Sequence, residues 1–436
     1  MKLPLPARGL ILTLFLFFSD ARAQEPETVL FRAGAAKRVV TPDPLLPISG
    51  GVGAGVPSTR KQGELSVRAV VLERAAANNS TNGLPPTRIA IVTGDFLGFP
   101  AALGDKVRVE VKAIPPQNIL IAATHAHSGP DCYGFPDSTG KPGANLEYLQ
   151  SVCDSMAAAI NEAVAALQPA TLRIATGEAV GRIAFNAYAE QLYDPRCSVI
   201  QAGTASDTIF TLVNYAIHPE VLGNDRGITS PDLVGPMTDR LEQSVGGIGM
   251  FVNGAQGGMV TADNRDPETG EDIGTWEECQ RIGSLLADEA LRIIATDTTR
   301  DPAPILRCHA RRVAFPVESS MMRAIIERSP LGIKMNNDNA IETTINVIEL
   351  GDARIATIPG EALPNIGYYL KRKMGGGQNL LFGLTNDAFG YILTEVDFDS
   401  FKRYRYITRT SLGERTGRIL IDSILGLIAS EVDQPE

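Results

Sequence analysis

Short apolar runs alternate with longer amphipathic stretches along the chain. Short runs rich in β-branched residues indicate strands at 67–72, 88–92, 118–123, 208–216, 249–252, 345–350, 354–358 and 380–384. A helical spacing of apolar positions indicates helices at 146–167, 276–294, 361–373 and 411–428. Ser230-Pro231-Asp232 is typical of a further helix start, with a helix to about residue 244. The alternation predicts an α/β fold, or a mixed α+β one, with a mixed β-sheet core flanked by helices.

The first residues have the pattern of a secretory signal peptide. Lys2 and Arg8 precede an apolar stretch at 9–18, and Ala21-Arg22-Ala23 is a small-x-small cleavage site. The apolar stretch is too short for a membrane span, which needs about 20 residues, and no later segment is long and apolar enough. We therefore expect cleavage after residue 23, export to the periplasm or the exterior, and no transmembrane segment.

Composition narrows the function classes. The chain has 436 residues, of which 44% are hydrophobic and 21% charged, and these values are typical of a globular protein. Its formal net charge is -10 and no Lys/Arg run stands out, which argues against a nucleic-acid partner. The five cysteines form no CxxC pair, so a thiolate zinc site is disfavoured and most are expected to be small buried hydrophobes.

Three of the four histidines lie just beyond predicted strands. His125 and His127 follow the strand at 118–123, and His218 follows the strand at 208–216. The carboxyl ends of strands are where α/β folds build their sites. If the strand continued, residues 125 and 127 would point to one face, although Ser128-Gly129-Pro130 turns the chain away. The alternative is a pair of strand-end histidines with only structural hydrogen bonds.

Two further strand ends carry polar groups. Glu361 follows the strand at 354–358, and Tyr391 follows the strand at 380–384. Glu361 could instead be a helix-start carboxylate stabilised by the helix dipole, and Tyr391 an ordinary interfacial aromatic. Two histidines and one carboxylate form a set typical of catalytic zinc sites, which keep one position open for water. The sequence therefore predicts a metal site at the carboxyl ends of strands.

Several motifs of the chain resemble those of the neutral, non-lysosomal ceramidase family. The matching segments are ILIAATHAHSGP at 119–130, NYAIHP at 214–219, FVNGAQGGMVT at 251–261, IPGE at 358–361 and NDAFGYILT at 386–394. The THxHSGP signal is quite specific, and the order of the motifs fits from about residue 31 to 428. The resemblance implies a zinc amidase that cleaves the N-acyl bond of ceramide. Because the chain ends where the family's immunoglobulin-like domain would start, residues 24–436 are expected to form a single catalytic domain.

The resemblance also implies residue roles. His125, His218, Glu361 and Tyr391 would hold Zn²⁺, and His127 would be the general acid/base beside it. Tyr404, one residue out of register, is the nearest match to the tyrosine that stabilises the oxyanion. A zinc-activated water would attack the amide carbonyl, and the general acid/base would return its proton to the leaving amine. The implied substrate is a ceramide-like lipid amide, with contact at a membrane surface a possibility.

The chain departs from the family in its substrate-contacting segments. Gly257-Gly258-Met259-Val260-Thr261 lacks the family's Asp and Ser, and Phe185-Asn186-Ala187 lacks its Arg. Arg182 or Arg196 could replace that Arg in space, while Ala388 stands in place of an aromatic residue. These changes leave the metal set intact. They keep open a zinc hydrolase for a different amide or ester, and a degenerate, non-catalytic metal-binding relative.

Other candidates carry weaker signals. Asp95 follows a strand and could orient a zinc-bound histidine, but a turn role fits as well. His309 lies in a mixed polar run and is expected to be structural. The Gly-rich turn at 253–258 could line the cavity or be a tight connection. Ser128 has no obvious Ser-His-Asp partner set, which disfavours a serine hydrolase.

Overall fold

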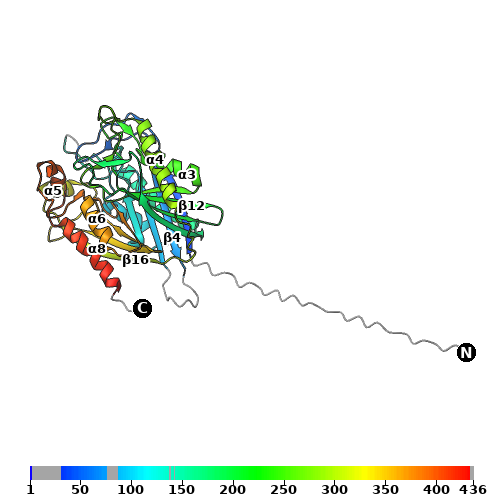
Figure 1. The fold of residues 1–436 in the computed structure, drawn as a ribbon. Coiled ribbons are helices and arrows are strands. Elements are labelled where there is room, and N and C mark those ends of the chain that lie inside the picture. Colours follow the sequence, from blue (N-terminus) through cyan, green and yellow to red (C-terminus); the bar gives the residue numbers. More distant parts are fainter. Residues whose placement is uncertain (2–30, 76–86, 137–138, 142, 433–436) are drawn as a thin grey trace.

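The computed structural model describes residue 1 and residues 31–75, 87–136, 139–141 and 143–432, as drawn in Figure 1. Apart from residue 1, the predicted signal peptide at 1–23 lies outside the described residues. Three β-sheets of four or five strands, with helices on their outer faces, make up most of the described part, and four two-stranded sheets complete it. The predicted mixed sheet core flanked by helices is confirmed.

The first sheet has the strand order β6-β5-β4-β1-β8. Its strands are β1 (Phe31–Val39), β4 (Ser66–Arg74), β5 (Thr87–Gly94), β6 (Ile119–Ala123) and β8 (Gln168–Pro169). β5 and β6 are parallel and joined through α1 (Ala101–Glu110), whereas the other neighbours are antiparallel. α2 (Leu146–Ala165) follows, and its first turn is capped because the Asn145 side chain accepts a hydrogen bond from Tyr148 N. Both helices pack on the outer face of this sheet.

The second sheet repeats this arrangement. Its order is β14-β12-β11-β9, with β9 (Thr171–Glu178), β11 (Arg196–Gly203), β12 (Thr208–Tyr215) and β14 (Ile248–Asn253). The parallel pair β12 and β14 is joined through α3 (Val234–Val245), and α4 (Trp276–Ile294) follows. The apolar stripe of α4 is buried against the sheet with α3, which explains its strong helical periodicity.

The third sheet has the same topology. Its order is β16-β17-β18-β20, with β16 (Leu306–Pro316), β17 (Ala340–Leu350), β18 (Ala353–Thr357) and β20 (Gln378–Phe382). The parallel pair β18 and β20 is joined through α6 (Pro364–Lys373), and the unit closes with α8 (Thr416–Val432). α5 (Ser320–Arg328) and the five-residue α7 (Arg405–Arg409) lie between these elements in the chain.

The remaining elements are short. They are β2 (Ile48–Ser49), β3 (Arg60–Lys61), β7 (Gly129–Pro130), β10 (Ala184–Asn186), β13 (Ile228–Thr229), β15 (Val260–Ala262), β19 (Glu361–Ala362), β21 (Tyr391–Ile392) and the 3-10 turns at 116–118 and 402–404. Among the described residues, none of the helices combines the length and the apolar character that a membrane crossing needs. All five cysteines are free, and four of them are buried.

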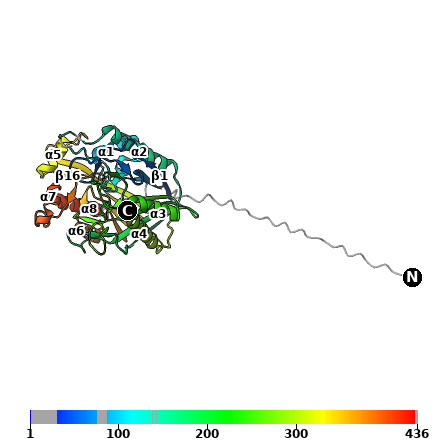
Figure 2. The same cartoon turned by 90° about the horizontal axis from the view of Figure 1, so that it is seen from above.

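The three sheets share one core. Their inner faces meet around apolar side chains such as Leu72, Phe210 and Phe382, one from each sheet. The helices of each unit cover the opposite face of its own sheet, so they lie around the periphery in Figure 2. Three units of like topology therefore surround a common centre, although the sequence shows no repeat.

The carboxyl ends of the parallel strands converge. A bridge joins Ala122 to Thr385, and Gly383 N donates to Asn253 O, so the ends of β6, β14 and β20 touch. Asn253 continues the contact through its side chain, which donates to Thr124 O and to Ile217 O. The residues that follow these strands therefore lie close together.

Two helix starts differ from the sequence prediction. α3 begins at Val234 rather than near residue 230, because Asp232 has a positive φ of 51° and its carboxylate accepts hydrogen bonds from Leu222 N and Leu233 N. Residues 361–362 form β19, so α6 begins only at Pro364. The capping interpretation of Glu361 is therefore wrong, since its carboxylate belongs to a strand-end cluster.

Candidate metal centre

His125 follows β6 and turns its side chain into the centre of the fold. Its backbone has a φ of 71°, an uncommon value for a residue with a side chain. Its amide donates to Phe96 O, and its Nδ1 lies 2.6 Å from Leu97 O. A carbonyl only accepts, so Nδ1 carries the proton and Nε2 presents a lone pair. Nε2 is buried and faces the carboxylate of Glu361.

His218 follows β12 and is held in the same way. Its Nδ1 lies 2.7 Å from Val260 O, and its own amide donates to that carbonyl. The side chain is buried, and its Nε2 faces the carboxylate of Glu361. Each histidine is therefore set by a backbone carbonyl so that Nε2 is the free ligand atom.

Glu361 completes a triangle of ligand atoms. Its Oε2 lies 3.2 Å from His218 Nε2 and 3.4 Å from His125 Nε2. Ligands about 2.0–2.1 Å from a tetrahedral metal are separated by roughly 3.3 Å, so these spacings fit one ion. Burial alone would raise the pKa of Glu361, but the charges and hydrogen bonds of His125 and His218 hold it well below its usual value. The carboxylate is therefore ionised, as a metal ligand must be.

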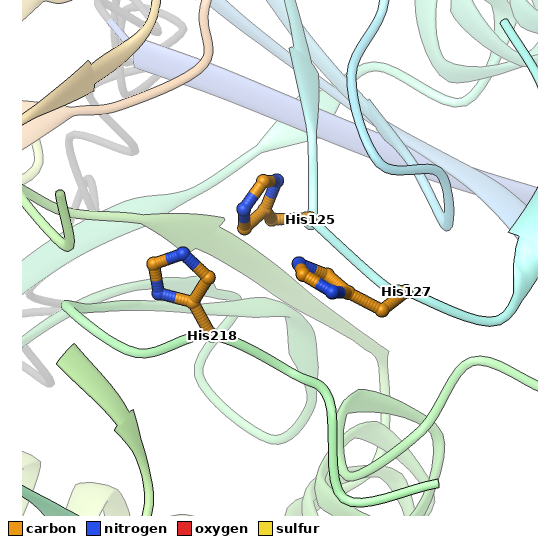
Figure 3. A group of neighbouring side chains, drawn as sticks. All are labelled: His125, His127 and His218. Atoms are coloured by element: carbon orange, nitrogen blue, oxygen red, sulfur yellow. The ribbon is translucent and has the colours of Figure 1, made fainter. Parts of the chain in front are cut away.

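His127 lies beside this triangle. One ligand nitrogen from each of His125, His127 and His218 lies within 4.8 Å of the others, and Figure 3 shows the three rings facing a common space. These histidines form a group that could hold a metal ion. Burial, together with His125 and His218, holds the pKa of His127 well below its usual value. Its Nδ1 lies 3.3 Å from Glu220 Oε2, while its buried Nε2 makes no hydrogen bond to a described residue.

Tyr391 lies next to Glu361 in the short parallel pair of β19 and β21. Its hydroxyl is 3.5 Å from Met259 Sδ. Burial, with the nearby charge of Glu361, raises the pKa of this phenol well above its usual value. The structure therefore brings four of the predicted residues together with His127, and Tyr391 is a neutral phenol there.

A pocket with largely apolar walls opens onto these side chains. His125, His127, Glu361 and Tyr391 lie at its base. The apolar and aromatic side chains of the walls come from the loop at 50–52, the segment after β5, the loop at 133–135, α5, the segment between β20 and β21, and α7. They are Val52, Leu97, Tyr133, Phe135, Met322, Ile325, Ala388 and Tyr406. Apart from the site itself, these walls carry no charged side chain. The pocket is suited to an apolar group next to a metal-assisted reaction.

No protein-family model and no curated protein matches the sequence. Solved structures with a similar fold do match. A structure described as a ceramidase complexed with C2 has a TM-score of 0.70 at 17% sequence identity, over 93% of this chain and 76% of that one. The neutral ceramidase from Pseudomonas aeruginosa has a TM-score of 0.71 at 16% identity, over 93% and 75% of the two chains. The chain has a neutral ceramidase-like fold.

The pocket contains Tyr406 rather than Tyr404. Tyr404 is buried, stacks on Tyr188 with ring centroids 5.6 Å apart, and does not line the pocket. Tyr406 lines it and packs against Tyr391 with ring centroids 5.8 Å apart. Burial raises the pKa of Tyr406 to about 12, so its hydroxyl stays protonated. Tyr404 ends the 3-10 turn at 402–404, and Tyr406 lies in α7.

Arg182 and Arg196, the two arginines considered from the sequence, do not line the pocket. Arg196 binds the carboxylate of Asp194 through both Nε and a terminal nitrogen. Arg182 lies 3.9 Å from Asp263 and donates to Arg265 O. Neither residue lines the pocket.

The weaker candidates have structural roles. Asp95 accepts hydrogen bonds from the amide and the hydroxyl of Ser66. His309 lies on β16, opposite Val347, and Ser128 Oγ donates to Gly223 O. Asn253, with its side chain on Thr124 O and Ile217 O, fixes the residues just before His125 and His218 rather than lining the cavity.

Proposed function

We propose that the chain is an exported zinc-dependent amidohydrolase that cleaves the N-acyl amide bond of ceramide or a related lipid. The observation that carries the proposal is the triangle of His125 Nε2, His218 Nε2 and Glu361 Oε2, with edges of 3.2 and 3.4 Å to Glu361. It lies at the base of an apolar pocket in a neutral ceramidase-like fold. A buried His/His/carboxylate set is typical of catalytic zinc sites.

The donor set favours zinc over harder cations. Imidazole nitrogens suit zinc, whereas magnesium and calcium prefer oxygen ligands. His125, His218 and Glu361 would hold the ion, with Tyr391 as a candidate fourth ligand next to Glu361. When bound, zinc would supply Lewis-acid activation of water and of the amide carbonyl.

His127 is the proposed general base and acid. Its low pKa leaves Nε2 unprotonated at neutral pH and able to accept a proton from the attacking water. Glu220 holds Nδ1 and so fixes the tautomer. The same Nε2 then delivers the proton to the leaving amine nitrogen, which must be protonated before the C–N bond breaks.

Tyr406 is proposed to hydrogen-bond the amide oxygen. Its hydroxyl is protonated and its ring forms part of the pocket wall. A donor placed where negative charge develops lowers the barrier. This position takes the role that the sequence resemblance gave to Tyr404, which does not line the pocket.

The test compares ceramides with short N-acyl amides as substrates for purified protein, with the metal content measured on the same sample. Stoichiometric zinc and release of fatty acid from ceramide support the proposal. Substoichiometric metal that zinc cannot restore would overturn it and favour a non-catalytic relative. The matched control is His309→Gln, which removes a histidine outside the cluster and is expected to keep zinc and activity.

A different amide or ester is the second candidate substrate. It is favoured by Ala388, which lines the pocket in place of an aromatic residue, and by the absence of the family's arginine. Turnover of short N-acyl amides without turnover of ceramide would select this candidate. The zinc site would remain as proposed.

Export and domain organisation complete the proposal. We infer that cleavage after Ala23 leaves a mature chain beginning at Gln24, with residues 24–436 as one catalytic domain. Intact mass and N-terminal sequencing of protein from the periplasm or medium test the cleavage site. A protein that retains residues 1–23 would contradict it.

A further inference from the structure

The rim of the pocket continues into a surface segment at 396–409, here called the rim segment. Tyr406 in this segment lines the pocket wall, as does Thr410 immediately after it. The rim segment therefore lies at the entrance through which a substrate must pass. Its exposed side chains combine two chemistries.

The first chemistry is apolar. Val396 is 84% exposed, Phe401 52% and Tyr406 43%, and the neighbouring pocket residue Val52 is 38% exposed. Large apolar side chains with this much exposure are costly in water when they lie together. Three of them lie on the rim segment, and Val52 and Tyr406 also line the pocket, which points to a surface that is covered when the protein works.

The second chemistry is cationic. Between Ser400 and Arg409 the segment carries Lys402, Arg403, Arg405 and Arg409, all exposed, and no acidic residue. They do not form one uninterrupted run because aromatic and other residues separate them. None makes an ion pair with any residue that the structure describes, although the chain has a net charge of -10. The carboxylates nearby are Glu395, paired with Arg418, and Asp397, bonded to Asn365 and Thr394, with exposed Asp399 before the cations.

The segment is held in a fixed orientation. Tyr404 and Ile407 are buried in a small apolar cluster with Tyr391 and Leu363. Tyr404 also stacks on Tyr188, whose carbonyl accepts a hydrogen bond from Arg403. With these side chains turned inward, the cations and Phe401 are left on the outer side.

We propose that the rim segment docks the protein on an anionic lipid bilayer, with Val396 and Phe401 entering the interface and the four cations facing lipid headgroups. Aromatic and aliphatic side chains flanked by Lys and Arg are suited to the boundary of an anionic membrane. The segment would place the pocket entrance against the bilayer, where a lipid amide resides. That last step rests on the proposed substrate, but docking itself is measured without turnover, so the two can fail separately.

The local cations of the rim segment, rather than the net charge of the chain, set the expected salt dependence of binding. Electrostatic attraction acts over about 10 Å at 0.1 M salt, so a local cationic surface can bind a membrane although the chain is acidic overall. Each Lys or Arg near an anionic surface strengthens binding by roughly fivefold. Two substitutions should therefore weaken binding by roughly 25-fold.

The test is cosedimentation of the full chain with vesicles of phosphatidylcholine alone or of equal parts phosphatidylcholine and phosphatidylglycerol. Wild type is expected to bind the anionic vesicles, weakly at high salt, and to bind neutral vesicles poorly. Lys402→Gln with Arg405→Gln, two exposed side chains that make no ion pair with a described residue, should lower binding by roughly 25-fold. Val396→Ser with Phe401→Ser should lower it by about tenfold.

The matched control is Arg372→Gln with Lys373→Gln. These exposed cations also lie beside an exposed aromatic residue, Tyr369. They end α6, which runs from the carboxyl end of β18 back to the start of β20, and are therefore at the opposite end of the sheet from the site. The control should bind anionic vesicles like wild type.

Three outcomes would overturn the proposal. Wild type could fail to bind anionic vesicles, the rim variants could bind as well as wild type, or the control could lose binding equally. A concentration-dependent dimer in light scattering that the Val396/Phe401 variant abolishes, without vesicle binding by wild type, would assign the surface to a second copy of the chain. Thermal unfolding of each variant at wild-type temperature excludes misfolding as the cause.

Discussion

The cluster of ligand atoms and the wall of the pocket are built in different ways. His125 and His218 are each fixed by a hydrogen bond from Nδ1 to a backbone carbonyl, and Asn253 ties together the strand ends that precede them. The wall includes residues of the loop at 50–52, of α5 and of α7. Two of them, Val52 and Tyr406, are partly exposed. Hydrogen bonds to the backbone fix the orientation of the candidate ligand side chains, whereas side-chain packing sets the shape of the pocket. The two should therefore respond differently to substitution.

Removal of a ligand carboxylate should have the largest effect. Glu361→Gln replaces the charge that faces both histidines, so we expect loss of zinc and a fall in kcat of about a thousandfold or more. Metal analysis and kinetics on the same sample measure both. Zinc content and kcat near wild type would refute the assignment of Glu361 to the ligand set.

Substitution of Glu220 should separate the ligands from the proton-transfer residue. In Glu220→Gln an amide that can donate or accept replaces the carboxylate at His127 Nδ1, so the tautomer is no longer fixed. We expect a fall in kcat of about tenfold with zinc retained. Glu190→Gln, which removes an exposed carboxylate paired with Arg265, is the control. Equal kcat in the two variants would mean that Glu220 does not orient His127.

A substitution in the pocket wall should weaken substrate binding and leave the metal content unchanged. Ile325→Ala shortens an apolar side chain that lines the pocket. We expect KM for the lipid amide to rise about fivefold with kcat and zinc nearly unchanged. Ile333→Ala truncates a partly buried isoleucine of the same core outside the pocket and serves as control. A loss of zinc in Ile325→Ala would show that wall and ligands are coupled.

A carboxyl between the two regions should affect stability but not turnover. Asp387 is buried, and burial raises its pKa to about 6 although it accepts hydrogen bonds from Ala101 N and Ala388 N. A raised carboxyl pKa contributes stability below the unfolded value of 3.8, and that stability is lost as pH rises through about 6. Between pH 4 and pH 7.5 the free energy of unfolding of wild type should therefore fall by about 3 kcal/mol through this group, and that of Asp387→Asn should not.

Denaturant unfolding at the two pH values, with kcat at neutral pH, measures this difference. Asp95→Asn is a poor control because Asp95 is also buried and hydrogen-bonded. The exposed Asp288→Asn serves instead. The same pH dependence in wild type and Asp387→Asn would mean that Asp387 titrates near its ordinary pKa in the fold.

Local patterns were sufficient to predict the strongly periodic elements. The helix at Trp276–Ile294 has the predicted bounds, because its apolar stripe is buried along its whole length. Strands β1, β9, β11 and β16 were not predicted, since polar residues interrupt their apolar positions. The threefold arrangement was also missed, because three units can share strand order and crossover helices while their side chains differ.

The site could be predicted in part. Scarce histidines at strand ends and the motif resemblance singled out His125, His127, His218 and Glu361, which the structure brings together. Their roles and that of Tyr391 stay predictions. Glu220 and Asn253 act through contacts between segments far apart in the chain, which no local pattern reveals. Which of Tyr404 and Tyr406 lines the pocket depends on the tertiary packing of their segment, which residue spacing does not give.

The positive φ of His125 has a consequence for engineering and for evolution. An imidazole side chain in the left-handed region costs on the order of 1 kcal/mol that a glycine would not. Selection for thermal tolerance alone would thus drive position 125 toward Gly, and selection for turnover would drive it back. A heat-resistant variant without the imidazole at position 125 is the result to watch for whenever this protein is improved without an activity screen.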